Sequence, residues 1–177
     1  MKRFNFAAAL VGISLVAVPM RAHAQLSTVV KPVQFGVAAG AAIPLSDFSN
    51  NFSTGYNGTI TVGFNPALIP LGIRVDGAYN HFDFKGGGAS IHITSATGNL
   101  VYKFPSMTVS PYGIGGIGLY NFGGSGGGSE NEFGWNLGGG ISLPLSGFDA
   151  FVEARYNQAQ KNGVSTKFVP ITFGIMF

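Results

Sequence analysis

The sequence has 177 residues, enough for one domain, and only 10% of them are charged while 28 are glycine. A composition this apolar excludes disorder driven by charge, so the chain must bury its apolar surface or place it in a membrane. Cysteine is absent, which excludes disulfide bridges, thiol catalysis and cysteine-based metal sites.

The N-terminus has the layout of a secretion signal. A basic start precedes an apolar run at residues 7–18, and Ala22 and Ala24 form the small-x-small pattern of a signal-peptidase site. The apolar run is too short to cross a bilayer core of roughly 30 Å as a helix. We therefore predict a signal peptide at residues 1–24, followed by a short periplasmic segment at residues 25–32.

Loss of this signal changes the charge of the chain. The full sequence carries a formal charge of +3, with ten basic and seven acidic residues. Three basic residues, Lys2, Arg3 and Arg21, leave with the signal, so seven basic residues remain against seven acidic ones. The mature chain is then neutral. Nucleic-acid binding, which needs a clustered basic patch, is not predicted.

From residue 33 onward, apolar residues alternate with small or polar ones, which is the period of a strand with two different faces. The first four segments with this pattern are residues 33–43, 55–65, 72–84 and 90–104. In the third, Ile73 and Val75 alternate with Arg74 and Asp76. Each segment is predicted to be a strand.

Four more segments follow, at residues 110–122, 132–143, 148–158 and 166–177. The fifth segment is dense in glycine, and the sixth has an especially clear alternation. In the seventh, Glu153 and Arg155 fall on the polar face. None of the eight segments has the pattern of a helix.

The lengths of the segments suit a membrane barrel, because a tilted strand crosses a bilayer in about 9 to 11 residues. A sheet in lipid must close, since an open edge would leave N–H and C=O groups unpaired. Single-chain bacterial barrels have even strand numbers from eight upward. The predicted fold of residues 33–177 is therefore all-β, an eight-stranded antiparallel up-and-down transmembrane β-barrel.

A soluble barrel or sandwich is the alternative, and it would carry its apolar face inside. Two features favour lipid: the strand charges avoid the apolar face, and aromatic residues collect near the strand ends, as membrane interfaces favour. With the N-terminus in the periplasm, the predicted periplasmic girdle contains Phe35, Phe64, Tyr102, Phe104, Tyr112 and Phe177, and the external girdle Tyr56, Tyr79, Tyr120, Phe122, Phe133, Trp135 and Tyr156.

The order and spacing of several runs carry a resemblance to a known family. These runs are Phe35-Gly36-Val37, Leu45-Ser46-Asp47-Phe48, residues 99–105, residues 111–120, residues 151–156 and the terminal Phe177. With them the chain resembles the small OmpA-like and opacity-type outer-membrane barrels. The resemblance implies export through the periplasm to the outer membrane and a C-terminal signal for the barrel-assembly machinery at Phe173, Ile175 and Phe177. A structural role in the envelope, contacts with outer-membrane lipid and lipopolysaccharide, and a monomeric state are expected with it.

Four charged residues are the candidate site of the barrel interior. Strands three and seven lie opposite each other in an eight-stranded barrel, so Arg74 and Asp76 are expected to face Glu153 and Arg155 across the lumen. Eight strands enclose just enough space for side chains, and buried charges of balanced sign should pair. We therefore predict an ion-pair network that plugs the lumen. The alternative is a narrow small-solute channel that opens when the pairs exchange partners.

The two mature histidines are the candidates for catalysis. A hydrolase at the lipid-facing rim would need histidine with serine and an acid, and Asp83, Ser90 and Ser95 lie near His81 and His92 in the sequence. No nucleophile motif surrounds them, and two histidines without a third ligand make a poor metal site. We predict no enzyme activity, cofactor or metal, and a lipid A-modifying enzyme is the less favoured alternative.

Overall fold

The computed structural model describes residues 32–66, 70–104, 109–124, 129–161 and 164–177. In these residues the chain forms β1 (Val33–Leu45), α1 (Asp47–Asn51), β2 (Gly55–Phe64), β3 (Leu71–Asp83), β4 (Ser90–Lys103), β5 (Ser110–Gly124), β6 (Ser129–Pro144), β7 (Asp149–Lys161) and β8 (Val164–Met176). No helix of the described part is long and apolar enough to cross a membrane. The predicted signal peptide, with Ala22 and Ala24, and most of the segment 25–32 lie outside the described residues.

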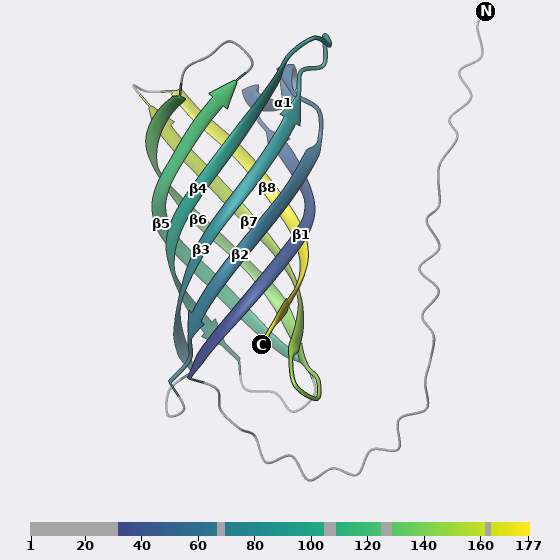
Figure 1. Ribbon diagram of the computed structural model, residues 1–177. Coiled ribbons are helices and arrows are strands. Elements are labelled where there is room, and N and C mark those ends of the chain that lie inside the picture. The colour runs from purple at the N-terminus through teal and green to yellow at the C-terminus, as the bar shows by residue number, and fades with distance from the viewer. Residues whose placement is uncertain (1–31, 67–69, 105–108, 125–128, 162–163) are drawn as a thin grey trace, which may run out of the picture.

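The strands close into a barrel. Each strand pairs antiparallel with its neighbour along the chain, and β1 also pairs with β8, from Gly36 opposite Met176 to Leu45 opposite Lys167. Figure 1 shows α1 at one end of the barrel, and the start of β1 with the C-terminus at the other end. The predicted eight-stranded up-and-down barrel is confirmed. Following the expected placement of the N-terminus, we call the end with α1 external and the opposite end periplasmic.

The outer surface of the barrel is apolar, and the middle of its interior is polar. Ile60 and Leu137 are 68% and 61% exposed on the outside, whereas their neighbours Thr61 and Asn136 point inward and are 5% and 2% exposed. A soluble protein places these residue types the other way round. The two faces therefore suit a barrel that contacts lipid outside and fills its lumen with side chains.

Several strands extend further than the alternation predicts. The hairpin of β5 and β6 pairs as far as Gly123 opposite Ser129, although the predicted segments stop at residue 122 and start at residue 132. Backbone pairing continues there because ladder hydrogen bonds do not depend on an alternating side-chain pattern. In the other direction, four strands (β2, β3, β4 and β8) each end one residue before the predicted end.

The short helix α1 was not predicted, because five residues are too few to show a helical period. Two aromatic rings hold it in place: Phe48 in the helix lies 5.0 Å from Phe82 between ring centroids, and Phe52 directly after the helix lies 5.7 Å from Phe84. Lys85 Nζ also donates a hydrogen bond of 2.7 Å to the carbonyl oxygen of Ser49. A helix this short is unstable by itself. Contacts with the end of β3 and the turn that follows it therefore keep α1 on the barrel.

The prediction that Tyr112 and Tyr120 belong to the aromatic girdles is wrong. Their exposed fractions are 6% and 0%, because they point into the barrel, whereas Ile117 and Leu119 face outward from the same strand and are each 58% exposed. Apolar residues occur on both faces of β5, so its alternation did not determine which face is inside. Phe122, also assigned to the girdle, is partly buried and packs against the buried cluster at the external end.

Candidate functional site

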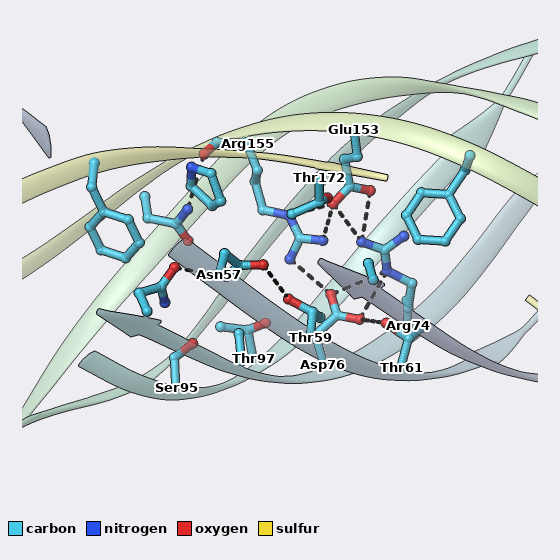
Figure 2. A pocket seen from close by; sticks show the side chains of 17 residues that line it. Asn57, Thr59, Thr61, Arg74, Asp76, Ser95, Thr97, Glu153, Arg155 and Thr172 are labelled. Atoms are coloured by element: carbon cyan, nitrogen blue, oxygen red, sulfur yellow. Dashed lines mark hydrogen bonds and ion pairs between the residues drawn. The ribbon is translucent and has the colours of Figure 1, made fainter. Parts of the chain in front are cut away.

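The four predicted charged residues meet in the centre of the lumen. Arg74 and Asp76 point inward from β3, and Glu153 and Arg155 point inward from β7. Residues two apart on a strand share a face, so each strand presents one cation and one anion side by side. Figure 2 shows these side chains linked across the interior.

Each guanidinium contacts both carboxylates. Arg74 Nη2 lies 2.7 Å from Glu153 Oε2, and Arg155 Nη1 lies 2.8 Å from Asp76 Oδ2, so two ion pairs cross between the strands. Within β3, Arg74 Nε lies 3.1 Å from Asp76, and within β7 Arg155 Nη2 pairs with Glu153. The four side chains form a closed ring of ion pairs, which we call the ionic layer.

The ionic layer is buried and electrically neutral. Asp76 and Glu153 are 1% and 4% exposed, and Arg74 and Arg155 are 5% and 8% exposed. A buried charge is costly unless it is paired and hydrogen-bonded, and here two cations balance two anions. None of the four groups is therefore left as an unpaired charge that could attract an ionic ligand.

Neutral side chains complete the hydrogen bonds of the two carboxylates. Asp76 accepts from Thr61 Oγ1 at 2.6 Å and from Asn99 Nδ2 at 2.9 Å, and Glu153 accepts from the hydroxyl of Tyr112 at 2.8 Å. Sequence reasoning did not identify these three partners. Thr61 and Asn99 could have been found, because both lie on the polar faces of their predicted strands. Tyr112 could not, because the face of β5 that carries it was predicted to point outward.

Small cavities lie against the ionic layer. One touches all four charged residues and is further lined by hydroxyl and amide side chains such as Asn57, Thr59 and Ser95, as Figure 2 shows. Its volume is about 30 Å³, which is room for roughly two water molecules. A second cavity of about 20 Å³ runs from Asn65, Lys103 and Asp149 at the periplasmic end to Arg74.

An apolar cluster fills the lumen at the external end. Phe82, Ile93 and Tyr120 are all 0% exposed, and Phe168 is 1% exposed. The rings of Phe82 and Phe168 meet edge to face at 5.7 Å, and Phe48 of α1 packs against Phe82. We call Phe48, Phe82, Ile93, Tyr120 and Phe168 the aromatic stopper.

The histidine candidates lie on the outward face of the β3–β4 hairpin near its external end, with Asp83 and Ser90 on the same face. His81 and His92 are opposite each other on β3 and β4, but the His81 ring stacks on Tyr56 and the His92 ring stacks on Tyr79. His81 Nε2 lies 3.1 Å from Asp83 Oδ1 at the exposed rim.

Ser95 lies apart from this pair, since it points into the lumen and is 9% exposed. Ser90 is paired with Asp83 across the β3–β4 ladder. Across the described ranges, no group of three or more histidine, cysteine, aspartate or glutamate residues is placed to hold a metal ion.

The predicted C-terminal signal residues lie on the outside of β8. Phe173 and Phe177 are 61% and 51% exposed, and Ile175 shares their face and is partly buried. Phe173 stands between Ala39 of β1 and Val152 of β7 in the ladders. These three side chains therefore contribute to the apolar outer surface at the seam where the barrel closes.

Comparisons with known proteins agree with this architecture. The family model described as outer membrane protein beta-barrel domain matches residues 8–177. The crystal structure of Neisserial surface protein A (NspA) is 18% identical with a TM-score of 0.69, covering 82% of this chain and 96% of that one. None of the curated proteins matches the sequence.

Two further solved structures have the same fold. The outer membrane enzyme PagL is 17% identical with a TM-score of 0.53, over 81% of this chain and 98% of that one. Ail, the attachment invasion locus protein of Yersinia pestis, is 16% identical with a TM-score of 0.51, over 82% and 97%. Identities this low establish a shared fold and leave the activity to be argued from the residues.

Proposed function

This chain belongs to the outer membrane protein beta-barrel domain family and is located in the outer membrane, and we propose that it is a non-enzymatic structural protein of the envelope. Its lumen, in this proposal, is plugged by the ionic layer. The observation that carries the proposal is the closed ring of Arg74, Asp76, Glu153 and Arg155, all at most 8% exposed.

The physical argument for a plug is one of space and charge. An eight-stranded barrel has an interior just wide enough for its own side chains. Here the ionic layer joins opposite walls of the barrel, with Arg74 bonded to Glu153 and Arg155 bonded to Asp76. A solute could pass only if buried ion pairs separated, and breaking one such pair costs about 3–5 kcal/mol.

The test is the conductance of the purified protein in planar lipid bilayers. A plugged barrel should add no stepwise current to that of the lipid, at low or high salt. Heat-dependent mobility on SDS gels of the same preparation should verify that folded barrels were present. Stable current steps from the native protein would contradict the proposed plug.

The narrow channel is a second candidate, and one observation favours it. Because Arg74 and Arg155 each contact both carboxylates, the pairs could exchange partners without leaving a charge alone. Cavities lie beside the layer. A channel gated in this way predicts that Glu153→Ala raises the conductance, whereas a purely structural plug predicts unchanged conductance in that variant.

The third candidate is a lipid A-modifying enzyme, for which the pair of His81 and Asp83 offers a starting point. The outer membrane enzyme PagL has the same fold, so a barrel of this kind is compatible with an enzyme, but a shared fold transfers no activity. Expression of the protein should leave the mass of lipid A unchanged if the structural role is correct. A mass shift that disappears in His81→Ala or His92→Ala would instead establish the enzyme.

The expected partners follow from the outer surface. We propose that the apolar face contacts outer-membrane lipid and lipopolysaccharide, that the barrel is a monomer, and that Phe173, Ile175 and Phe177 are read by the barrel-assembly machinery. The exposed aromatic rings of Phe173 and Phe177 support this role for the C-terminus. We also propose removal of residues 1–24 on export, which the intact mass of the purified protein would report.

A further inference from the structure

The aromatic stopper and the ionic layer lie at different depths of the same lumen. Along β4 the inward residues run from Ile93 in the stopper, through Ser95 and Thr97, to Asn99, which donates to Asp76 of the ionic layer. The larger cavity lies between them, because its lining includes Phe168 of the stopper and all four charged residues. This space is a small polar chamber with a barrier on each side.

The two barriers differ in chemistry. The ionic layer is held by ion pairs, and the second cavity reaches its Arg74 from the periplasmic end, past the partly buried Lys103 and Asp149. The stopper consists of aromatic and aliphatic side chains, and Phe82, Ile93 and Tyr120 in it are completely inaccessible to solvent. Its one polar side-chain group, the hydroxyl of Tyr120, donates to Asn157 in the wall of the chamber. Ions cross a dry apolar constriction poorly, because no polar group replaces their water.

On its external side, the stopper is also held in place by α1. Phe48 packs on Phe82. In the β3–β4 turn, Lys85 donates hydrogen bonds to the carbonyl oxygens of Ser49 and Asn51 in α1. The backbone N–H of Ser53 donates to the carbonyl oxygen of Asp83 at 2.9 Å. The external barrier is therefore a packed and hydrogen-bonded structure in which α1 serves as the cover.

From this arrangement we infer that the lumen has two barriers in series, and that the aromatic stopper alone keeps it closed toward the outside when the ionic layer is opened. The inference deepens the proposed function and rests on it, because both require a closed native barrel. It assigns the outer seal to Phe82 and Phe168 rather than to the ion pairs.

Conductance in planar bilayers tests the inference with paired substitutions. Arg74→Ala with Glu153→Ala removes one of the two ion pairs that cross the lumen and leaves the second, Arg155–Asp76, balanced, and Phe82→Ala with Phe168→Ala opens the stopper. Each double variant should remain at the lipid background, and the combined quadruple variant should show stable current steps. Steps from Arg74→Ala/Glu153→Ala alone would overturn the inference but not the plug, whereas steps from the native protein would contradict both.

Thiol labelling on intact cells gives a second test that does not need the quadruple variant. The natural chain has no cysteine, so a single Ser95→Cys substitution reports access to the chamber. A small charged methanethiosulfonate reagent added outside should not react with Ser95→Cys, but should react once Phe82→Ala and Phe168→Ala are added. Asn50→Cys on the exposed surface of α1 is the matched positive control.

The labelling outcomes decide between the two barriers. If Ser95→Cys reacts from outside as fast as Asn50→Cys in the otherwise native chain, the stopper is no seal. If it stays unreactive after both phenylalanines are replaced, the external barrier consists of other residues. Either result would overturn the inference.

Discussion

Gly134 and Gly140 leave space that two tyrosine rings occupy. A methyl group added at Gly134 would lie 2.7 Å from Cε2 of Tyr120, and one added at Gly140 would lie 2.6 Å from the hydroxyl oxygen of Tyr112. Both rings are buried in the lumen. The glycines of β6 therefore determine which large side chains the narrow interior can accept.

Replacement of Gly134 by alanine should destabilise the folded barrel by about 1–3 kcal/mol, because the added methyl group would lie 2.6 Å from the carbonyl oxygen of Gln158 as well as against the Tyr120 ring. The measurement is equilibrium unfolding of the barrel in urea in the presence of lipid vesicles. Gly113→Ala is the control, since no atom lies within 4 Å of the added methyl group at that position. Equal stability of the two variants would show that neither the Tyr120 ring nor the backbone at Gln158 packs tightly against Gly134.

The ion pairs should behave differently when one partner or both are removed. Glu153→Ala leaves Arg74 and Arg155 buried with Asp76 as their common partner, and should cost about 3–5 kcal/mol of unfolding free energy. Adding Arg74→Ala restores the charge balance, so the double variant should be more stable than the sum of the two single effects predicts. The measurement is a double-mutant cycle in the same unfolding assay, and additive effects would argue against a direct pair.

For single residues, the sequence identified the charged members of the ionic layer but not the neutral side chains that donate hydrogen bonds to them. Arg74, Asp76, Glu153 and Arg155 were identified because spacing by two places them on one face and the strand count places β3 opposite β7. Tyr112 was assigned to the membrane interface, because a tyrosine near a strand end suits either a girdle or a lumen. Only the three-dimensional pairing of β5 with the glycines of β6 resolves that ambiguity.

At the scale of the strand, the outward faces define where the lipid lies. Leu137 is 61% exposed near the middle of β6, while Leu143 is 39% exposed near its periplasmic end. An arginine facing the middle of a bilayer costs about 2–4 kcal/mol, and close to the interface only about 0–1 kcal/mol. Leu137→Arg should therefore lower the unfolding free energy in lipid vesicles much more than Leu143→Arg, and similar losses would place the apolar band elsewhere.

Strands and the helix were not equally predictable as elements. Eight repeats of an alternating pattern constrain one another, because a closed sheet in lipid requires an even number of strands of sufficient length. The helix α1 has no such support in the sequence, and its one available signal was the spacing of Phe48 and Phe52, four residues apart. The contacts of these rings with Phe82 and Phe84 depend on the tertiary fold and could not be deduced from the loop alone.

For the whole molecule, a closed barrel predicts an unusual behaviour on gels. Every strand in the described part has two hydrogen-bonded neighbours, so the sheet has no free edge. SDS therefore has no unpaired strand at which unfolding could begin. Unboiled samples of the outer-membrane fraction should therefore migrate differently from boiled samples. Identical mobility before and after boiling would contradict a detergent-resistant barrel.

The pairing of β1 with β8 has a consequence for how the molecule is made. The backbone groups of Gly36 find their partner at Met176, almost at the opposite end of the chain, so this contact has nearly the largest sequence separation available. Contacts of this kind form slowly, because the entropy of closing a long loop must be overcome first. A chain in which synthesis stops before β8 would leave the edge of β1 open in or near the lipid. Both edges of β1 are therefore paired only after β8 has joined the sheet.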